Sequence, residues 1–276
     1  MLCFLSLSLI AIYIYHFDKI KIDMLLLAPN DYEYEAVLSG LNDKFKKVKI
    51  LKIDNAFKSQ KFCVFQKNGR CIVLACCGQR QGEVVCFLCN IMNLITPKTR
   101  CLLFGICGAN KEVKPGTIFF TKKYYVFKHL TISKEKRRHQ KSFLFFNDFY
   151  FSERNIYKFG LGENFVISNL IYCFSEKFSC CFGVNVCINA FINNYDFCRN
   201  VYNEIKSPIC FNTEDGFIKE FIIQNNKNIQ FFPVRVVSDN SGYSVHEIDD
   251  KGKVLACNTL KEIAPEIVNY FLEVFY

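Results

Sequence analysis

The sequence lacks the segments that usually divide a long chain into independent parts. No stretch rich in Gly, Ser or Pro interrupts its 276 residues, no internal repeat is visible, and Trp is absent. A chain of this length without a linker predicts one large domain, or at most two small ones. Hydrophobic residues make up 51% of the chain, which is enough for a full core and excludes a disordered composition.

Motifs for nucleic-acid binding are missing as well. The formal net charge of +9 would suit a nucleic-acid partner, because Lys and Arg neutralise phosphates. Much of the excess, however, lies in residues 134–141 and beside them at Lys122, Lys123 and Lys128. No zinc-finger, RNP-like or helix-turn-helix pattern accompanies this run. A local run of this kind is typical of a solvated loop, so we expect no nucleic-acid partner.

Cysteine is abundant, but it does not form a metal-binding pattern. Cys86 and Cys89 form a CxxC on a helical stretch, and no second pair stands at zinc spacing. We therefore expect no metal and no other cofactor. The chain has sixteen cysteines, which lie largely in apolar runs, where Cys acts as a small hydrophobe. This usage suits a reducing compartment, and we expect the protein in the cytoplasm.

The N-terminal apolar run Leu2–Tyr15 is shorter than the ~20 residues that a membrane-spanning helix needs. No basic segment precedes it and no small-residue cleavage site is clear, which disfavours a signal peptide. The first core strand is expected near Ile22. We interpret residues 1–20 as an apolar extension and residues 21–276 as the domain, with no membrane association. A non-cleaved anchor is the alternative interpretation.

Apolar runs of strand length alternate with helix-like stretches along the chain. The predicted strands are Met24–Ala28, Cys71–Cys76, Cys101–Phe104, Ile118–Phe120, Val184–Ile188 and Pro233–Val237. The predicted helices are Tyr34–Leu41, Glu83–Ile95, Thr213–Gln224 and Leu260–Phe275. This alternation predicts an α/β fold, a three-layer αβα sandwich around a central mixed β-sheet. Ligands of such sheets bind where strands end, so polar residues at strand ends are the candidates for chemistry.

Four segments place polar residues or glycines at such positions. They are Ala28–Val37, Leu103–Asn110, Gly183–Asn193, and Thr213–Gly216 taken together with Val234–Asn240. Each has an ordinary explanation when taken alone, because acidic residues favour helix N-termini and glycines favour turns.

Together and in this order, the segments resemble the 5′-methylthioadenosine/S-adenosylhomocysteine nucleosidases of the nucleoside phosphorylase superfamily. Residues 183–193 are similar to that family's G-L-I-V-S-G-D-A-F-I-N stretch, and residues 190–193 match it outright. Residues 104–110 resemble its T-G-S-A-G-G turn, and residues 28–37 its opening A-M-E-E-E-V. Thr213-Glu214 stands where the family has Met-Glu, and Arg235–Asp239 resembles its R-x-x-S-D. The resemblance spans roughly residues 22–275 and implies a nucleoside phosphorylase-like fold.

The resemblance implies different roles for three carboxyl groups in the release of adenine from a purine nucleoside. Asp239, held by Ser238, is the general acid that protonates the leaving adenine at N7. Glu214 binds the ribose hydroxyls and stabilises the sugar as it becomes cationic. Glu35 activates the attacking water, and Glu33 is the alternative residue for this role.

The resemblance also implies the substrate contacts and the assembly. Phe191 stacks on adenine, and backbone groups of Ile192 read the edge of the base. Thr213, Ile106 and Cys107 complete the substrate-binding residues. The family implies a homodimer, in which the partner chain closes the 5′ end of the pocket.

Two departures from the family pattern bear on activity. Thr213 replaces a Met, which removes an apolar contact to the sugar, and Asp215 replaces a small residue, which adds a charge near the pocket. A phosphate-dependent purine nucleoside phosphorylase is one alternative function. Its G-D-P-x-R stretch has no Arg here, and Arg80 is the only basic candidate nearby. A nucleoside-binding protein with degraded catalysis is the second alternative.

Overall fold

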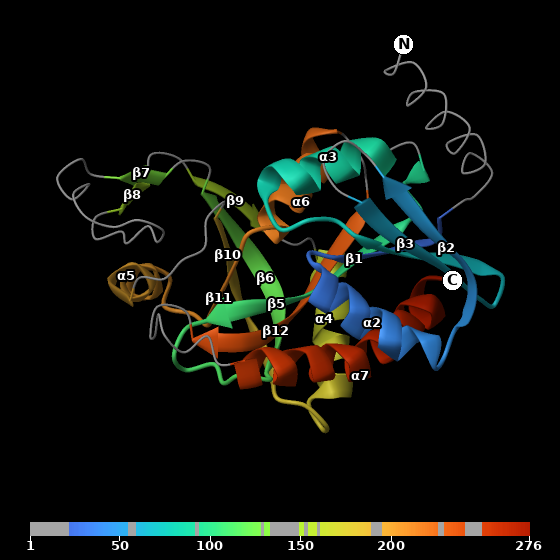
Figure 1. Ribbon diagram of the computed structural model, residues 1–276. Helices are drawn as coiled ribbons and strands as arrows, with labels where there is room; N and C mark the ends of the chain where they lie inside the picture. Colours follow the sequence, from blue (N-terminus) through green and yellow to red (C-terminus); the bar gives the residue numbers. More distant parts are fainter. Residues whose placement is uncertain are drawn as a thin grey trace, which may run out of the picture.

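The computed structural model describes residues 22–54, 59–91, 94–127, 130–132, 149–151, 154–158, 161–188, 195–225, 229–240 and 250–276 (Figure 1). The apolar run Leu2–Tyr15, the basic run at 134–141 and the predicted adenine contacts Phe191 and Ile192 lie outside these residues.

Strands and helices follow one another along the described chain, but in two places three or more strands come in succession without a helix between them. The strands are β1 Met24–Ala28, β2 Lys46–Asp54, β3 Ser59–Lys67, β4 Arg70–Cys76, β5 Arg100–Ala109, β6 Ile118–Phe127, β7 Leu130–Ile132, β8 Phe149–Phe151, β9 Arg154–Lys158, β10 Cys180–Ile188, β11 Ile209–Asn212 and β12 Gln230–Asn240. The helices are α2 Asp31–Asn42, α3 Gln81–Ile91, α4 Leu161–Phe174, α5 Tyr195–Ile205, α6 Asp215–Gln224 and α7 Asp250–Phe275. All six predicted strands lie within observed ones.

Ten of these strands form one mixed sheet, in the order β11-β10-β6-β12-β5-β1-β4-β3-β2, with β9 on the side of β6. The central pairs β12–β5, β5–β1 and β1–β4 are parallel. The pairs β2–β3, β3–β4, β6–β9 and β12–β6 are antiparallel. The α/β class and the mixed sheet are therefore confirmed.

The sheet is not a flat middle layer, because part of it closes on itself. Strand β11 pairs with β10 on one side and with β5 on the other, where Cys210 stands opposite Ala109. Strands β11, β10, β6, β12 and β5 consequently form a closed ring. Register shifts in β10 and β12 lie within this ring, and such irregularities bend strands and increase their twist. Over these strands a ring replaces the central layer of the predicted sandwich.

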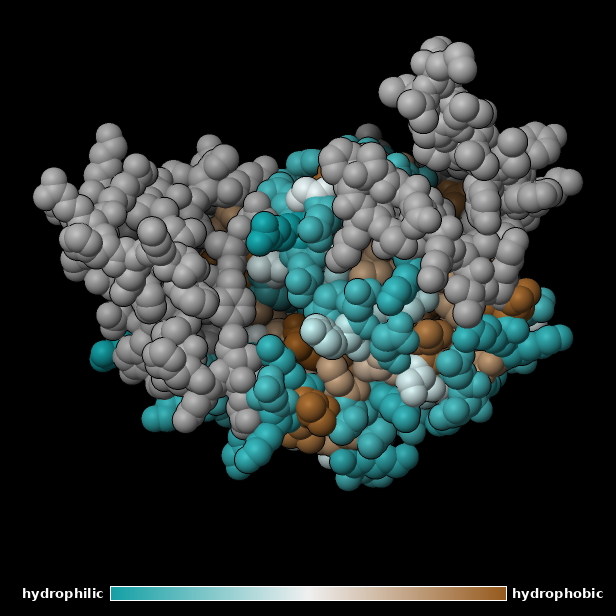
Figure 2. Space-filling model, viewed as in Figure 1, coloured by the Kyte–Doolittle hydropathy of each residue, from teal (hydrophilic) through white to brown (hydrophobic). Residues whose placement is uncertain are grey.

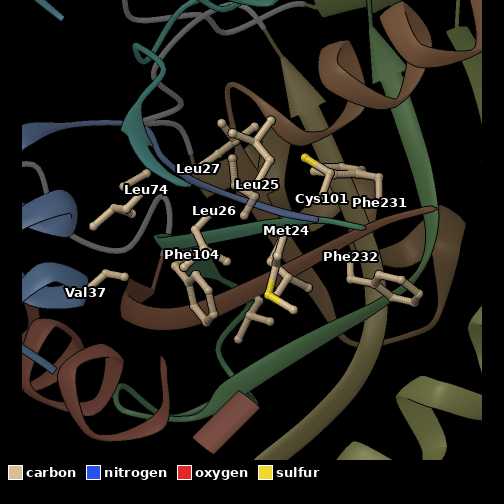
Figure 3. Close-up of a cluster of buried hydrophobic side chains, with 14 of the residues drawn as sticks. Met24, Leu25, Leu26, Leu27, Val37, Leu74, Cys101, Phe104, Phe231 and Phe232 are labelled. Carbon is tan, nitrogen blue, oxygen red and sulfur yellow. The ribbon is translucent and has the colours of Figure 1, made fainter. Parts of the chain in front are cut away.

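The core is built around β1, which lies between β4 and β5 and is buried along its whole length. Figure 3 shows its side chains, Met24 to Leu27, among Leu74 of β4, Phe104 of β5 and Phe232 of β12. A continuous apolar run is what a parallel strand covered on both faces requires. In Figure 1, α3 and α6 lie on one side of the sheet, and α2 and α7 lie on the other.

The coloured surface in Figure 2 is mostly hydrophilic, with hydrophobic residues scattered over it. The helices of the described residues include none that is both long enough and apolar enough to span a membrane.

Helix α7 begins at Asp250, ten residues before the predicted helix at Leu260. Its first turn packs against the end of β12 at Gly252, where a Cβ atom would clash with the carbonyl oxygen of Ser238. Only glycine allows this approach of helix to strand. This contact brings the start of α7 beside the Ser238-Asp239 segment.

Replacing Gly252 with Ala is expected to lower the free energy of unfolding by about 1–3 kcal/mol, because the new methyl group forces helix and strand apart. Gly82→Ala is the matched control, since Gly82 also lies in the first turn of a helix and a Cβ there meets no atom within 4 Å. That variant is expected to be neutral or slightly stabilising. Urea denaturation measures both, and equal effects would show that the close contact at Gly252 is unimportant.

Candidate active site

A cavity of about 680 Å³ lies where β5 and β12 end and α2, α6 and α7 begin. Six of the nine predicted site residues line it: Ile106, Cys107, Thr213, Glu214, Ser238 and Asp239. They come from three segments far apart in sequence, and the parallel pairing of β5 with β12 brings two of these together. This is the edge of an α/β sheet at which ligands bind.

Asp239 sits at an irregularity near the end of β12. Val237 stands opposite Cys107 and Asp239 opposite Gly108, so Ser238 is an extra residue in the strand. Such a bulge redirects the side chains that follow it. The Ser238 hydroxyl donates to Asp239 Oδ2 at 2.7 Å. Burial raises the pKa of Asp239, and the hydrogen bond from Ser238 and the charge of Lys253 partly offset this rise.

Glu214 immediately precedes α6 and is buried. The side-chain oxygen of Asn212 accepts hydrogen bonds from the backbone N–H groups of Glu214 and Asp215, at 3.1 and 3.0 Å. These bonds satisfy donors that a helix N-terminus otherwise leaves unpaired. Thr213 contacts the Glu214 carboxyl group and donates to the carbonyl oxygen of Gln79 at 2.5 Å. Burial raises the pKa of Glu214, against the opposing effect of Arg235.

The two candidate glutamates of α2 lie on different faces of the helix. Glu33 is 1% exposed and lines the cavity. The side chain of Glu35 is 57% exposed, pairs with Lys61 at 3.4 Å and does not line the cavity. Residues two apart on a helix point in directions about 200° apart, so only one of them faces the core. Glu35, predicted as a site residue, therefore lies outside the cavity, whereas Glu33, the alternative, lies at its wall.

Both oxygens of Glu33 are held by backbone groups. Oε2 accepts from the N–H of Asn30 at 3.0 Å, which completes a capping box at the start of α2. Oε1 accepts from the N–H of Ile106 at 2.7 Å. Burial raises the pKa of Glu33 from 4.5 to about 8, although Arg235 opposes the shift. A carboxyl group with this pKa is mostly protonated at neutral pH.

A buried guanidinium group joins these carboxyl groups. Arg235 is 1% exposed, and its Nη2 donates to Glu214 Oε2 at 2.6 Å. Its Nη1 lies 3.9 Å from Glu33 Oε1 and donates to the carbonyl oxygen of Ile106 at 3.0 Å. A side chain at Gly105 would clash with Arg235 Nη1 and would approach Glu33 Oε1 to 3.0 Å. Gly105 thus makes room for an ion pair, whereas Gly108 of the same segment lines the cavity.

Sequence reasoning missed one wall of the cavity, which comes from α7. Asp250, Lys253, Val254, Cys257 and Asn258 line it. These residues precede the predicted start of the helix. Arg80, the basic residue considered for phosphate, is exposed and does not line the cavity. Within the described ranges, no group of three or more His, Cys, Asp or Glu residues is placed to hold a metal ion.

Comparisons by sequence find no relatives: no family model matches the chain, and no curated protein matches it. Comparisons by structure find solved proteins with a similar fold. A 5′-methylthioadenosine/S-adenosylhomocysteine nucleosidase from Helicobacter pylori, complexed with a pyrrolidine-based ligand, superposes with a TM-score of 0.68 at 12% identity. The match covers 90% of this chain and 98% of that one.

Two further structures extend the likeness. A putative nucleosidase of the same kind from Borrelia burgdorferi, bound to adenine, gives a TM-score of 0.67 at 14% identity, over 91% of this chain and 99% of that one. The futalosine hydrolase of Helicobacter pylori gives 0.65 at 10% identity, over 92% and 98%. The chain therefore has the fold shared by 5′-methylthioadenosine/S-adenosylhomocysteine nucleosidases and futalosine hydrolase.

Proposed function

We propose that this protein is an enzyme that hydrolyses the N-glycosidic bond of a purine nucleoside, 5′-methylthioadenosine or S-adenosylhomocysteine, and releases adenine. The observation that carries the proposal is the convergence of Glu33, Glu214 and Asp239 on one cavity. The fold shared with nucleosidases, one of which is bound to adenine, supports it.

Asp239 is the proposed general acid. Adenine leaves as a neutral base only if a proton reaches N7 while the bond between N9 and C1′ breaks. A carboxyl group donates that proton more readily near neutral pH when its pKa is raised, as burial raises that of Asp239. The Ser238 hydroxyl holds the carboxyl group at 2.7 Å. Phe191 and Ile192 remain the proposed contacts to the adenine ring.

Glu214 and Glu33 are proposed to act on the sugar and the water. As the bond breaks, the sugar becomes cationic, and a carboxylate that accepts hydrogen bonds from its hydroxyls stabilises it. Glu214 lies at the cavity wall for this contact, with Thr213 beside it. Glu33 accepts a proton from water, and the resulting hydroxide oxygen bonds to C1′. This step uses the ionised form of Glu33, which becomes the major form above a pH of about 8.

The charges of the cavity favour water over phosphate as the nucleophile. A phosphate needs free cationic or N–H donors. All three guanidinium nitrogens of Arg235 already contact carboxyl or carbonyl oxygens. Lys253 is the one other Lys or Arg among the described residues that line the cavity, and its charge acts on Asp239. Glu214, and Glu33 once it is ionised, would repel a phosphate placed near the sugar.

The proposal includes a homodimer in a reducing cytoplasm. Tyr32 and Val254 line the cavity and are 79% and 58% exposed, so a second chain covering them would close the mouth and bury apolar surface. The cysteines of the described residues are all free thiols, and eight of them are buried. Buried free cysteine is common in proteins of reducing compartments.

The decisive assay measures release of the free base, which is adenine from 5′-methylthioadenosine, S-adenosylhomocysteine and adenosine and hypoxanthine from inosine, with and without phosphate. Release from the first two that does not depend on phosphate supports the proposal. Release that requires phosphate would make the protein a phosphorylase, and no release from any of the four would leave a binding protein on this fold.

Glu33→Gln is expected to reduce kcat by at least about 100-fold, because a general base typically contributes about 10²–10⁴-fold. Glu35→Gln is the matched control, since it makes the same substitution on the exposed face of the same helix. That variant is expected to retain kcat within about threefold, because a surface ion pair contributes little. If Glu35→Gln were the damaging change, the assignment of Glu33 would be refuted.

Asp239→Asn is expected to lower kcat by about 10²–10⁴-fold while the folded structure persists, because the amide cannot protonate the base. Steady-state kinetics measure the loss, and circular dichroism confirms the fold. A loss of less than tenfold would remove Asp239 from the role of general acid.

The raised pKa of Glu33 also predicts a pH dependence of stability. A carboxyl group whose pKa is higher in the folded state stabilises the fold at low pH. That contribution is lost as the pH rises from about 4.5 towards about 8. Between pH 5 and pH 8 the wild type should lose up to about 4 kcal/mol more unfolding free energy than Glu33→Gln. Urea denaturation at the two pH values measures the difference, and parallel curves would mean that Glu33 is not buried as a neutral acid.

A further inference from the structure

Asp215 follows Glu214 in sequence but points the other way. It is the first residue of α6, is 0% exposed and does not line the cavity. Its carboxyl group faces Arg235, whose Nε donates to Oδ1 at 3.1 Å and lies 3.3 Å from Oδ2. Nη2 of the same guanidinium also contacts Oδ1. Asp215 therefore holds Arg235 by two nitrogens, from the side opposite the cavity.

A second contact fixes Asp215 itself. The side-chain amide of Asn185 in β10 donates to Asp215 Oδ2 at 2.6 Å. The oxygen of that amide accepts from the side chain of Asn212 at 2.6 Å. Asn185 is fully buried, so these hydrogen bonds are formed in a region of low dielectric constant, where they are strong. A continuous path thus runs from Asn212 through Asn185, Asp215 and Arg235 to Glu214.

The charges of this cluster do not balance. Three buried carboxyl groups, those of Glu33, Glu214 and Asp215, lie around the single guanidinium of Arg235. Asp215 makes the most contacts with the guanidinium, so its carboxylate interacts most strongly with the positive charge. Glu33 and Glu214, which line the cavity, interact with that charge less strongly.

We propose that Asp215 is a positioning residue: it fixes Arg235 against the core and determines how much of the guanidinium charge reaches Glu214 and Glu33. Its effect is to raise the pH at which that pair releases its protons. The inference rests on the proposed function for the roles of the two glutamates, but its test does not require turnover.

Other titratable groups around the cluster do not change charge in this pH range. Tyr124 of β6, Cys187 of β10 and Cys210 of β11 face Asp215, and burial raises the pKa of each well above its usual value. Cys77, which follows β4 and faces Glu214, behaves in the same way.

Two more charges lie near the cluster. Lys219 of α6 pairs with Glu163 of α4 at 3.1 Å, and this pair is separate from Arg235.

The test follows the titration of the glutamates by NMR in protein labelled with ¹³C at the glutamate carboxyl carbon. The signals that disappear in Glu33→Gln and in Glu214→Gln identify the pair. Asp215→Asn keeps the shape of the side chain and removes its charge. Because one nearby negative charge is lost, the pair should release its protons about one pH unit or more lower than in the wild type.

Glu220→Gln is the matched control. Glu220 is also a buried carboxyl group of α6, at 5% exposure, and it makes no contact with Arg235. This variant should leave the titration of the Glu33–Glu214 pair within about 0.3 units of the wild type, because the charge it removes lies farther away. An equal shift in both variants would mean that any buried charge of α6 has this effect, and would overturn the specific role of Asp215.

Should Asp215→Asn fail to fold, Asn185→Ala is the second variant. It leaves every charge in place but removes the 2.6 Å hydrogen bond that offsets the charge of Asp215, so the pair should release its protons at a slightly higher pH than in the wild type. An unchanged titration in whichever variant folds overturns the proposal. A wild-type protein without turnover would contradict the proposed function, while the titration would still decide the role of Asp215.

Discussion

The buried guanidinium of Arg235 is the interaction on which the rest of the site depends. A charge with 1% exposure must be paired, and removing one partner of a buried ion pair typically costs about 3–5 kcal/mol. The partners come from the start of α2, the start of α6 and the backbone of β5. One side chain of β12 therefore joins three other elements at the edge of the sheet. Gly105 leaves the space in which they meet.

This arrangement explains why the candidate catalytic groups are poised for proton transfer. Each carboxyl group is withdrawn from water, and burial is the largest cause of the raised pKa at Glu33, Glu214 and Asp239. The guanidinium opposes that effect at the two glutamates, whereas Ser238 and Lys253 oppose it at Asp239. The environments thus differ from one end of the cavity to the other. A pocket that must donate a proton to a base and stabilise a cationic sugar needs this difference.

Much of the fold could be predicted from the sequence, because the central strands are continuous apolar runs such as Met24–Ala28. Strand β2 was missed because lysines interrupt its apolar residues, as in an edge strand. The start of α7 was missed because its first residues are charged and include Gly252, whose role depends on a contact with β12. Glu33 was identifiable, since it shares a helix face with Val37 and Leu41, which are apolar and buried. The pairing of Asp215 with Arg235 was not, because it depends on where the first residue of α6 lies relative to β12 in three dimensions.

We propose that the cavity binds a purine nucleoside with its base at Asp239 and its sugar at Glu214 and Glu33. A crystal structure of the protein with adenine and a cationic pyrrolidine analogue of the sugar would show this arrangement. We expect adenine N7 within hydrogen-bond distance of the Asp239 carboxyl group. We also expect the pyrrolidine between the base and Glu214, with a water molecule on Glu33. Adenine bound with N7 turned away from Asp239, or no occupancy of the cavity at saturating ligand, would contradict it.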